Sequence, residues 1–140
     1  MNTSFFSEIN WLAVLVAALA YFALGALWYS KALFAKKWIL HTKIDMTNPD
    51  VTKGMAGIMF MSFVFMFITC VGLAILRSRL ELDTWMGGAK LGLLTGLCFG
   101  VTAISISYLY EKRSTELHFI NGAYTLVGNI IAGIIICSWL

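Results

Sequence analysis

Charged residues are unevenly spread along this chain and leave four long apolar stretches. The stretches cover residues 9–30, 54–76, 87–110 and 118–140, and Lys90 is the one Asp, Glu, Lys or Arg within them. A helix needs about 20 mostly apolar residues to cross the hydrocarbon core of a bilayer. A soluble helical bundle would need polar helix faces, which these stretches lack. The pattern therefore predicts four membrane-spanning helices.

In lipid, only helices and closed barrels satisfy the hydrogen bonds of their own backbone. We therefore predict an all-α integral membrane four-helix bundle that forms a single domain over residues 1–140. Residues 1–8 contain no Lys or Arg, and the first stretch is too long for the apolar region of a signal peptide, so we expect it to be retained. Cys70, Cys98 and Cys137 all fall within predicted spans, which indicates packing residues and not a disulfide framework.

The charges of the connections predict how the helices are oriented. With four crossings, the connections at residues 31–53 and 111–116 share one side and carry seven Lys and Arg residues, while the other side carries three. The positive-inside rule then places these two connections in the cytoplasm and both termini outside, an N-out/C-out topology. Tryptophan and tyrosine rings prefer the interfaces and fall at matching helix ends: Trp11, Trp85 and Trp139 outside, and Trp28, Tyr29, Tyr108 and Tyr110 inside.

The first connection contains a patterned segment, SKALFAKKWILHTKI, at residues 30–44. Lysines flank an apolar stripe formed by Leu33, Phe34, Trp38 and Ile44. This is typical of a basic amphipathic helix lying in the headgroup region against anionic lipid. A cytoplasmic extension of the first spanning helix is the alternative. The NPD sequence at 48–50 then supplies an N-cap, a first-turn proline and an acidic residue, so we expect helix to restart there.

Glycines recur at every fourth position of the third stretch, at Gly88, Gly92, Gly96 and Gly100. Glycine costs about 1 kcal/mol relative to alanine in a helix in water, so this repetition needs another reason. Helices in lipid are held together by close van der Waals packing, and the stripe predicts a groove that another helix fills. That helix belongs either to the same chain or to a second subunit. We expect close helix packing also at Gly25 and Gly128.

The fourth stretch carries Asn121, Thr125 and Asn129 on one face. Amide groups are unfavourable in hydrocarbon and should point into the bundle. They serve either as hydrogen-bonded contacts between helices or as the lining of a small cavity that binds a ligand. In the second case the candidate binding residues also include Tyr21, Trp28 and Tyr124.

Other chemistry has little support in the sequence. Met55, Met59, Met66 and Cys70 share one helix face, and thioether and thiol ligands can suit Cu(I). Methionine is common in cores, so we expect no metal and no cofactor.

No Asp, Glu or Arg lies deep in a span, where proton-coupled transporters usually place a carboxylate. No HExxH, GxSxG or phosphate-loop motif occurs, so we expect a protein that is not an enzyme. The net charge of +3 does not imply nucleic acid as a partner.

Both ends of the chain resemble a known family. NWLAVLVAALAYFALGALWYSKALFAKKW at 10–38 and LHFINGAYTLVGNIIAGIIICSWL at 117–140 are similar to the opening and closing helices of bacterial four-helix membrane proteins catalogued as domain of unknown function 1761. The family-like residues are Asn10, Gly25, Trp28, Tyr29, Phe34, Trp38, Asn121 and Tyr124. The resemblance implies the four-helix fold and brings no activity with it.

These observations lead to two main hypotheses for a multi-pass protein of the bacterial cytoplasmic (inner) membrane, with membrane lipids as partners. The first is a structural or accessory protein that acts through helix packing, as a homo-oligomer or as a subunit of a membrane complex. The second is a protein that binds or transports a small neutral or amphipathic molecule at the face formed by Asn121 and Asn129. A membrane enzyme is a third, less favoured hypothesis.

Overall fold

The computed structural model describes residues 4–139, and all regular elements within that range are helices. This confirms the predicted all-α class. Residues 1–3 of the predicted domain and residue 140, where the predicted fourth span ends, lie outside the described part. In chain order the elements are α1 (Phe5–Glu8), α2 (Trp11–Trp28), α3 (Ala35–Thr42), the 3₁₀ turn η1 (Pro49–Thr52), α4 (Met55–Leu80), α5 (Trp85–Thr95), the π-helix η2 (Gly96–Val101), α6 (Thr102–Tyr110) and α7 (Thr115–Ser138).

Four of the helical segments are long and apolar enough to cross a membrane. They are Trp11–Trp28, Pro49–Leu80, Trp85–Tyr110 and Thr115–Ser138. Each overlaps one of the four predicted spans. The length and apolar character of these segments indicate a multi-pass membrane protein.

Side-chain caps fix where three of the spanning helices begin. Asn10 Oδ1 accepts a hydrogen bond from the Ala13 amide at 3.1 Å, and Thr84 Oγ1 accepts one from the Gly87 amide at 3.0 Å. Ser114 Oγ accepts from the Leu117 amide at 3.3 Å at the start of α7. These oxygens satisfy first-turn amides that have no partner within the helix.

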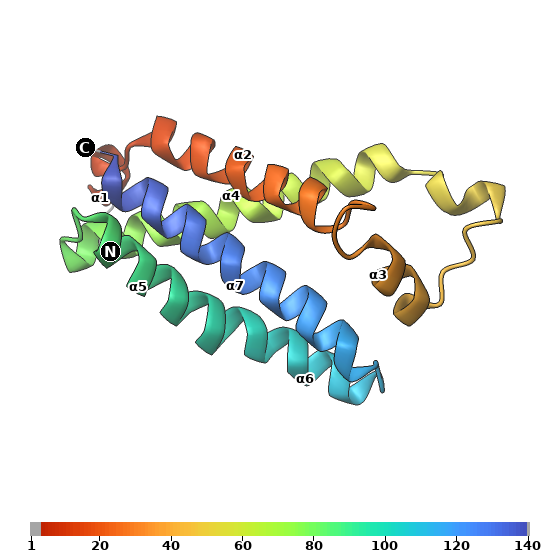
Figure 1. Ribbon diagram of the computed structural model, residues 1–140. Helices are drawn as coiled ribbons and strands as arrows, with labels where there is room; N and C mark the ends of the chain where they lie inside the picture. Colours follow the sequence, from red (N-terminus) through yellow and green to blue (C-terminus); the bar gives the residue numbers. More distant parts are fainter. Residues whose placement is uncertain (1–3, 140) are drawn as a thin grey trace.

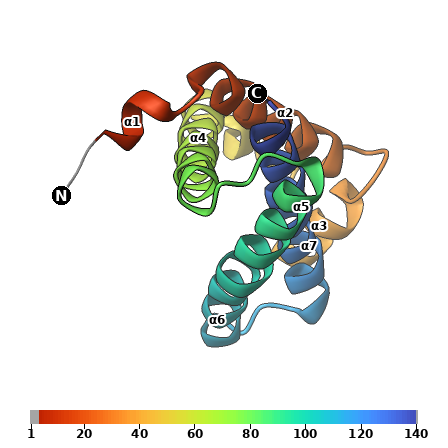
Figure 2. The ribbon, with the colours of Figure 1, turned by 90° about the vertical axis from the view of Figure 1, so that its left-hand side faces the viewer.

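Helix α7 lies at the centre of the bundle and packs against each of the other three spanning segments (Figures 1 and 2). Helices α2 and α5 to α6 run antiparallel to it, and α4 packs against α2 and α7. α7 also has more buried residues than any other of these helices, including Gly128, Asn129, Ala132 and Gly133. Small residues at these positions allow its neighbours to approach closely.

The glycine groove of α5 is filled by α7 of the same chain. A Cβ atom built on Gly88 would overlap the carbonyl oxygen of Gly133, and one built on Gly92 would overlap that of Asn129. A Cβ on Gly96 would lie 3.0 Å from the Cβ of Asn129. The two backbones are therefore in direct contact, and this is the physical reason for glycine at these positions.

The other small positions named from the sequence have different neighbours. A Cβ on Gly128 would overlap the ring of Tyr21, and one on Gly25 would lie 2.9 Å from the hydroxyl oxygen of Tyr124. A Cβ on Gly100 would lie 2.6 Å from the Thr125 methyl group. Gly25 and Gly128 thus leave room for tyrosine rings, whereas Gly88 and Gly92 leave room for a backbone.

Helix α3 is a separate element, so the alternative of a continuous extension of the first spanning helix is wrong. The chain turns between Tyr29 and Phe34, where the Phe34 amide donates to the carbonyl of Trp28 at 3.1 Å. Of the predicted apolar stripe, only Trp38 lies within α3. The rings of Phe34 and Trp38 pack on Trp28 and Tyr29, at 5.0 and 5.8 Å between centroids, while Leu33 and Ile44 are exposed.

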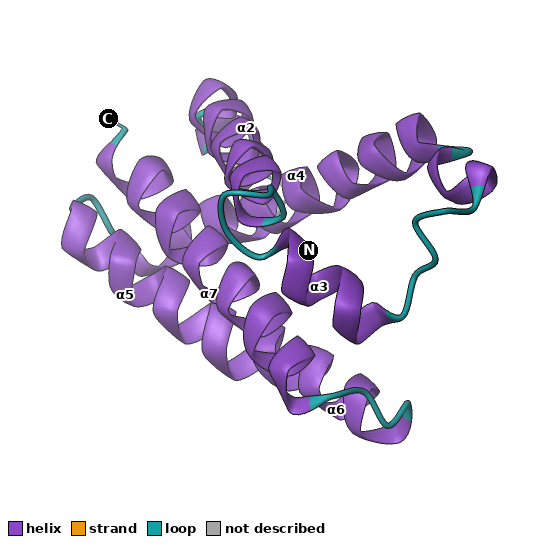
Figure 3. Cartoon of the chain, turned by 45° about the vertical axis from the view of Figure 1, so that its right-hand side comes forward, coloured by secondary structure: helices purple, strands orange, loops and turns teal. Residues whose placement is uncertain are grey.

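The NPD sequence begins the 3₁₀ turn η1, where helix was expected to restart, and η1 precedes α4 in the same candidate spanning segment. Asn48 Oδ1 accepts from the Asp50 amide at 3.0 Å, as an N-cap does, and Pro49 opens η1. α4 starts only at Met55, after Gly54 adopts a φ of 74°. The first half of α4 then diverges from α6 (Figure 3).

Candidate functional site

The polar face of α7 is divided between two places in the bundle. Asn129 lies in the interior with 5% of its surface exposed. Asn121 is half-buried about two turns nearer to α3, and Thr125 lies between the two. The six predicted binding residues do not form one site, because Tyr21 belongs to the interior group and Trp28 lies on another side of α7.

The interior group is a closed set of hydrogen bonds. Asn129 Nδ2 donates to the carbonyl of Thr125 at 2.8 Å and to the Tyr21 hydroxyl at 3.3 Å. Thr95 Oγ1 donates to Asn129 Oδ1 at 3.4 Å, and the Tyr21 hydroxyl donates to the carbonyl of Thr125 at 3.3 Å. Residues 4–139 contain no buried side-chain nitrogen or oxygen that lacks a partner. Asn129 therefore joins α2, α5 and α7 and has its amide occupied.

Asn121 belongs to a second chain of hydrogen bonds that links three helices near α3. The Tyr29 hydroxyl donates to Asn121 Oδ1 at 2.5 Å, and Asn121 Nδ2 donates to the Tyr108 hydroxyl at 2.6 Å. Sequence reasoning assigned both tyrosines to the membrane interface and missed their partnership with Asn121. Tyr29 is one of the family-like residues, and this was the one sign in the sequence that it belongs to a functional site. Nothing in the sequence pointed to Tyr108.

Aromatic rings surround this chain of hydrogen bonds. The ring of Tyr124 lies 5.4 Å from those of Tyr29 and Tyr21, between centroids, with an edge-to-face geometry in both cases. Its hydroxyl donates to the carbonyl of Tyr21 at 3.4 Å and approaches Met66 Sδ at 3.8 Å. Trp28 Nε1 donates to the carbonyl of Ile120 at 3.0 Å, which fixes the end of α2 on α7. The aromatic residues therefore hold Tyr29 and Asn121 in place.

Two open hollows meet at Tyr29, Ser62 and Tyr124. The first, which we call the α4–α6 hollow, has a volume of about 480 Å³. It is lined by Tyr29, Trp38, Ile58, Ser62, Ile104, Tyr108, Asn121, Tyr124 and Thr125. The second, the α2–α4 hollow, has a volume of about 470 Å³ and is lined by Phe22, Gly25, Ala26, Tyr29, Met59, Ser62, Met66 and Tyr124. Asn129 lines neither of them.

No charged side chain lines either hollow, so their chemistry is that of neutral hydroxyl and amide groups with aromatic and thioether surface. Within residues 4–139, no group of three or more His, Cys, Asp and Glu residues is arranged to hold a metal ion. On the methionine face of α4, Met66 contacts Tyr124, Cys70 is buried, and Met55 and Met59 are 41% and 47% exposed. The three cysteines are free thiols.

A protein-family model described as "Protein of unknown function (DUF1761)" matches residues 12–137 of the chain. The match covers nearly the whole chain and all four spanning segments, so the chain belongs to this family, and the resemblance seen at its two ends is confirmed. No curated protein and no solved structure matches the chain.

Proposed function

We propose that this protein binds a small uncharged amphipathic molecule in the α4–α6 hollow, and that Tyr29, Asn121 and Tyr108 supply the polar contacts. One observation carries the proposal. The side chains of Tyr29, Asn121 and Tyr108 are hydrogen-bonded to one another and line an open hollow of about 480 Å³. The sequence alone does not bring these three residues together. Pockets that hold small molecules usually measure about 300–1,000 Å³.

The remaining hydrogen-bonding capacity of the three side chains defines the ligand. The Tyr108 hydroxyl accepts from Asn121, so its own proton is still available to a ligand acceptor. The Tyr29 hydroxyl donates to Asn121, so its oxygen is still available to a ligand donor. A hydroxyl or amide group can satisfy both. A charged group would find no opposite charge in the lining and would lose its hydration.

The apolar part of the ligand would lie on aromatic and methionine surface. Beside the polar chain, the hollow continues past Tyr124 into the α2–α4 hollow, which Phe22, Met59 and Met66 line. The α4–α6 hollow is open between Ile58 of α4 and Ile104 of α6, and such a molecule would enter there from the bilayer, where amphipathic molecules concentrate.

Binding is favoured over transport because the centre of the bundle is closed. Asn129 is buried, its amide is occupied, and neither hollow extends to it. We also propose that the protein is not an enzyme, since the hollow offers no general base, nucleophile or metal ligands with the geometry that catalysis requires.

The test measures binding of an uncharged amphiphile to the purified full chain. Native mass spectrometry in detergent would count adducts of 1-monooleoylglycerol on the unmodified protein, on Asn121→Leu and on Asn129→Leu. We expect adducts on the unmodified protein and on Asn129→Leu, and a clear loss on Asn121→Leu. Equal adduct formation on all three proteins would contradict the proposal, and so would the absence of adducts from all three.

A structural or accessory role in a homo-oligomer or a larger membrane complex is the second candidate. One observation favours it: Ile58, Phe60 and Phe65 on the diverging part of α4 are 59%, 66% and 61% exposed. A helix of a second copy or of another membrane protein would cover this surface in place of lipid. The mass of the protein in mild detergent gives its oligomeric state and so tests this role. A monomer would mean that lipid, and not a second protein, covers these α4 side chains.

We further propose that the protein lies in a bacterial inner membrane with both termini outside. The loop charges support this orientation, since Lys31, Lys36, Lys37 and Lys43 lie at or near α3. In that orientation α3 lies in the cytoplasmic headgroup region, where its lysines meet anionic lipid.

A further inference from the structure

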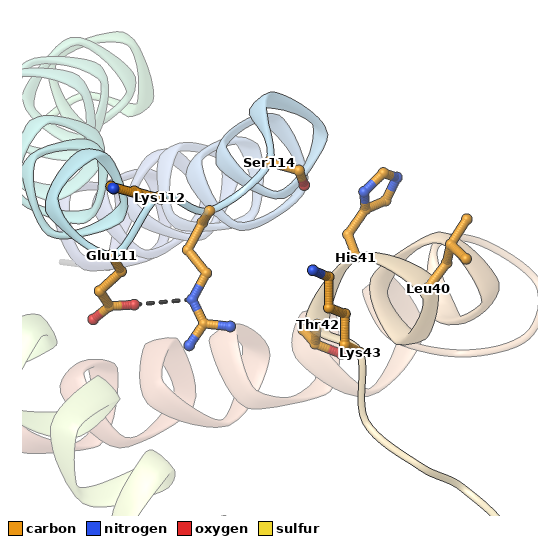
Figure 4. Close-up of a pocket in the computed structure, with 8 residues that line it drawn as sticks. Leu40, His41, Thr42, Lys43, Glu111, Lys112 and Ser114 are labelled. Atoms are coloured by element: carbon orange, nitrogen blue, oxygen red, sulfur yellow. Dashed lines mark hydrogen bonds and ion pairs between the residues drawn. The ribbon is translucent and has the colours of Figure 1, made fainter.

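The seam between α3 and α7 carries two hollows that neither the binding site nor the packing of the bundle uses. The outer hollow, with a volume of about 590 Å³, lies between the end of α3 and the turn that joins α6 to α7 (Figure 4). Its lining is polar and consists of Leu40, His41, Thr42, Lys43, Glu111, Lys112, Arg113 and Ser114. The inner hollow, of about 310 Å³, lies nearer the middle of the bundle along the same two helices.

Positive groups from both walls face the outer hollow. Lys43 extends from the end of α3 toward the α6–α7 turn, whereas Lys112 points away from α3 (Figure 4). Within residues 4–139, Lys43 forms no ion pair. Arg113 uses Nε to bind Glu111 at 2.9 Å, which leaves its two terminal nitrogens as donors. Ser114 accepts from the Leu117 amide and still has its hydroxyl proton to donate at the N-terminus of α7.

The two carboxylates nearby are already occupied. Glu111 pairs with Arg113, and Glu116 Oε2 lies 2.7 Å from His41 Nε2. The contact between His41 and Glu116 ties α3 to α7, and His41 lines the outer hollow while Glu116 lines the inner one. An anion in the outer hollow would therefore meet Lys43, the free side of Arg113 and the hydroxyl of Ser114.

The inner hollow is apolar and has one lysine at its edge. It is lined by Trp28, Phe34, Lys37, Glu116, Phe119, Ile120 and Ala123. Phe119 is 72% exposed and Leu40, which lines the outer hollow, is also 72% exposed. Phe119 belongs to the spanning helix α7, where exposed apolar side chains face acyl chains, and Leu40 belongs to α3 beside the headgroup region.

We propose that this seam is a specific binding site for an anionic phospholipid. The phosphate group would lie in the outer hollow against Lys43, Arg113 and Ser114, and an acyl chain would pass Leu40 and lie against Phe119 and Ala123. The order of polar and apolar surface along the seam matches the order of headgroup and chain in a lipid. Basic pockets between the ends of spanning helices bind anionic headgroups in this way. This site lies on a different side of α7 from the α4–α6 hollow and does not depend on it.

The experiment compares lipids that differ only in headgroup charge. Native mass spectrometry of the full chain in detergent would titrate phosphatidylglycerol and phosphatidylcholine with identical acyl chains. The variants are Lys43→Gln combined with Arg113→Gln, and as a matched control Lys36→Gln, which removes a charge from α3 outside both hollows. A surface lysine or arginine contributes roughly fivefold to the binding of anionic lipid, so we expect the double variant to bind phosphatidylglycerol about 20-fold more weakly and Lys36→Gln at most about fivefold more weakly.

Two further arms distinguish a lipid site from a site for free anions. Ala123→Phe fills the inner hollow without a change in charge, and we expect it to weaken phosphatidylglycerol as well as phosphatidylcholine. Inorganic phosphate at millimolar concentration should not displace the lipid. Displacement by phosphate would identify a free-anion site and overturn the proposal. Equal binding of phosphatidylglycerol to the double variant and to Lys36→Gln would overturn it too.

Discussion

The side chains of Asn129 and Tyr21, from the last and the first spanning helices, are joined by a hydrogen bond of 3.3 Å in the interior of the bundle. The Tyr21 ring reaches this position because Gly128 has no side chain at the point where the ring packs. Two features predicted for α7 therefore meet at Tyr21: the polar face contributes Asn129, and the small residue for close packing is Gly128. The Asn129 amide nitrogen, a candidate ligand contact from the sequence, thus has its partners within the bundle.

Replacement of Asn129 by leucine should destabilise the protein only modestly. Tyr21 still donates to the carbonyl of Thr125, and Thr95 Oγ1 can turn its proton to the carbonyl of Leu91, which lies 2.9 Å away, so no partner is left unpaired. A hydrogen bond between helices in lipid contributes about 0.6 kcal/mol on average. We expect a loss of about 0.6–2 kcal/mol in the unfolding free energy, measured by denaturation in mixed micelles. A loss far above this range would mean that Asn129 does more than join helices.

Replacement of Gly92 by alanine should be much more harmful than the same change at Gly57. A Cβ at Gly92 would overlap the backbone of Asn129 and Ile130, whereas a Cβ at Gly57 would have no atom of another helix within 4 Å among residues 4–139. Overpacking typically costs about 1–3 kcal/mol, and a rigid backbone places Gly92→Ala at the upper end. Gly57→Ala should be neutral or slightly stabilising, because alanine is the better helix former.

The measurement for this pair is the midpoint of thermal unfolding in one detergent. Equal midpoints for Gly92→Ala and Gly57→Ala would show that α5 and α7 are not in backbone contact. Both changes add one methyl group to a helical glycine, so effects of propensity and volume cancel in the comparison.

The four spans and their packing residues were predictable because they depend on local properties. Apolar length marks a spanning helix, and a glycine every fourth residue marks one face of a helix wherever it occurs. The sequence could not decide whether α7 or a second subunit fills the groove, because a groove has the same pattern in both cases. The answer depends on Gly133, whose place opposite Gly88 follows only from the crossing of the two helices.

The binding hollow was less predictable because it depends on long-range pairing. Asn121 was found from the helical wheel, but its partners Tyr29 and Tyr108 come from other helices. Tyrosine near the end of a spanning helix is also expected at the membrane interface. That expectation explained the positions of Tyr29 and Tyr108 without any contact to Asn121. The π-helix at Gly96–Val101 escaped prediction for a similar reason, because its residues are compatible with a regular α-helix.

Removal of one hydroxyl should distinguish the α4–α6 hollow from the surface near it. Tyr108→Phe takes away the group that accepts from Asn121, while Tyr110→Phe takes away a hydroxyl from a residue that is 87% exposed. One hydrogen bond contributes about 0.5–1.5 kcal/mol, so Tyr108→Phe should bind 1-monooleoylglycerol about two- to tenfold more weakly. Tyr110→Phe should bind it as the unmodified protein does. Equal affinities of the two variants would exclude Tyr108 from the site.

The orientation can be tested with a single cysteine at Lys43. Cys70 and Cys137 are buried, and Cys98 is exposed, so the background variant is Cys98→Ala. In intact cells, a membrane-impermeant maleimide should leave Lys43→Cys unlabelled until the inner membrane is opened, if α3 lies in the cytoplasm. A cysteine at Glu81, between α4 and α5, should be labelled without opening. The opposite labelling pattern would reverse the topology.

The π-helix should hold one extra residue without changing the rotation of α6 relative to α5, and so keep Tyr108 at Asn121. A π-helix accommodates about one extra residue in a turn. Deletion of Cys98, an exposed residue within η2, should therefore restore a regular helix and leave the rotation of α6 relative to α5 unchanged. The backbone contacts of Gly88 and Gly92 with α7 precede the deletion and should persist. Tyr108 would then still face Asn121. A short bismaleimide should cross-link Tyr108→Cys to Asn121→Cys both in the Cys98→Ala background and in the deletion variant. The two proteins lack the same thiol, so loss of cross-linking in the deletion variant alone would show that η2 does not hold one extra residue.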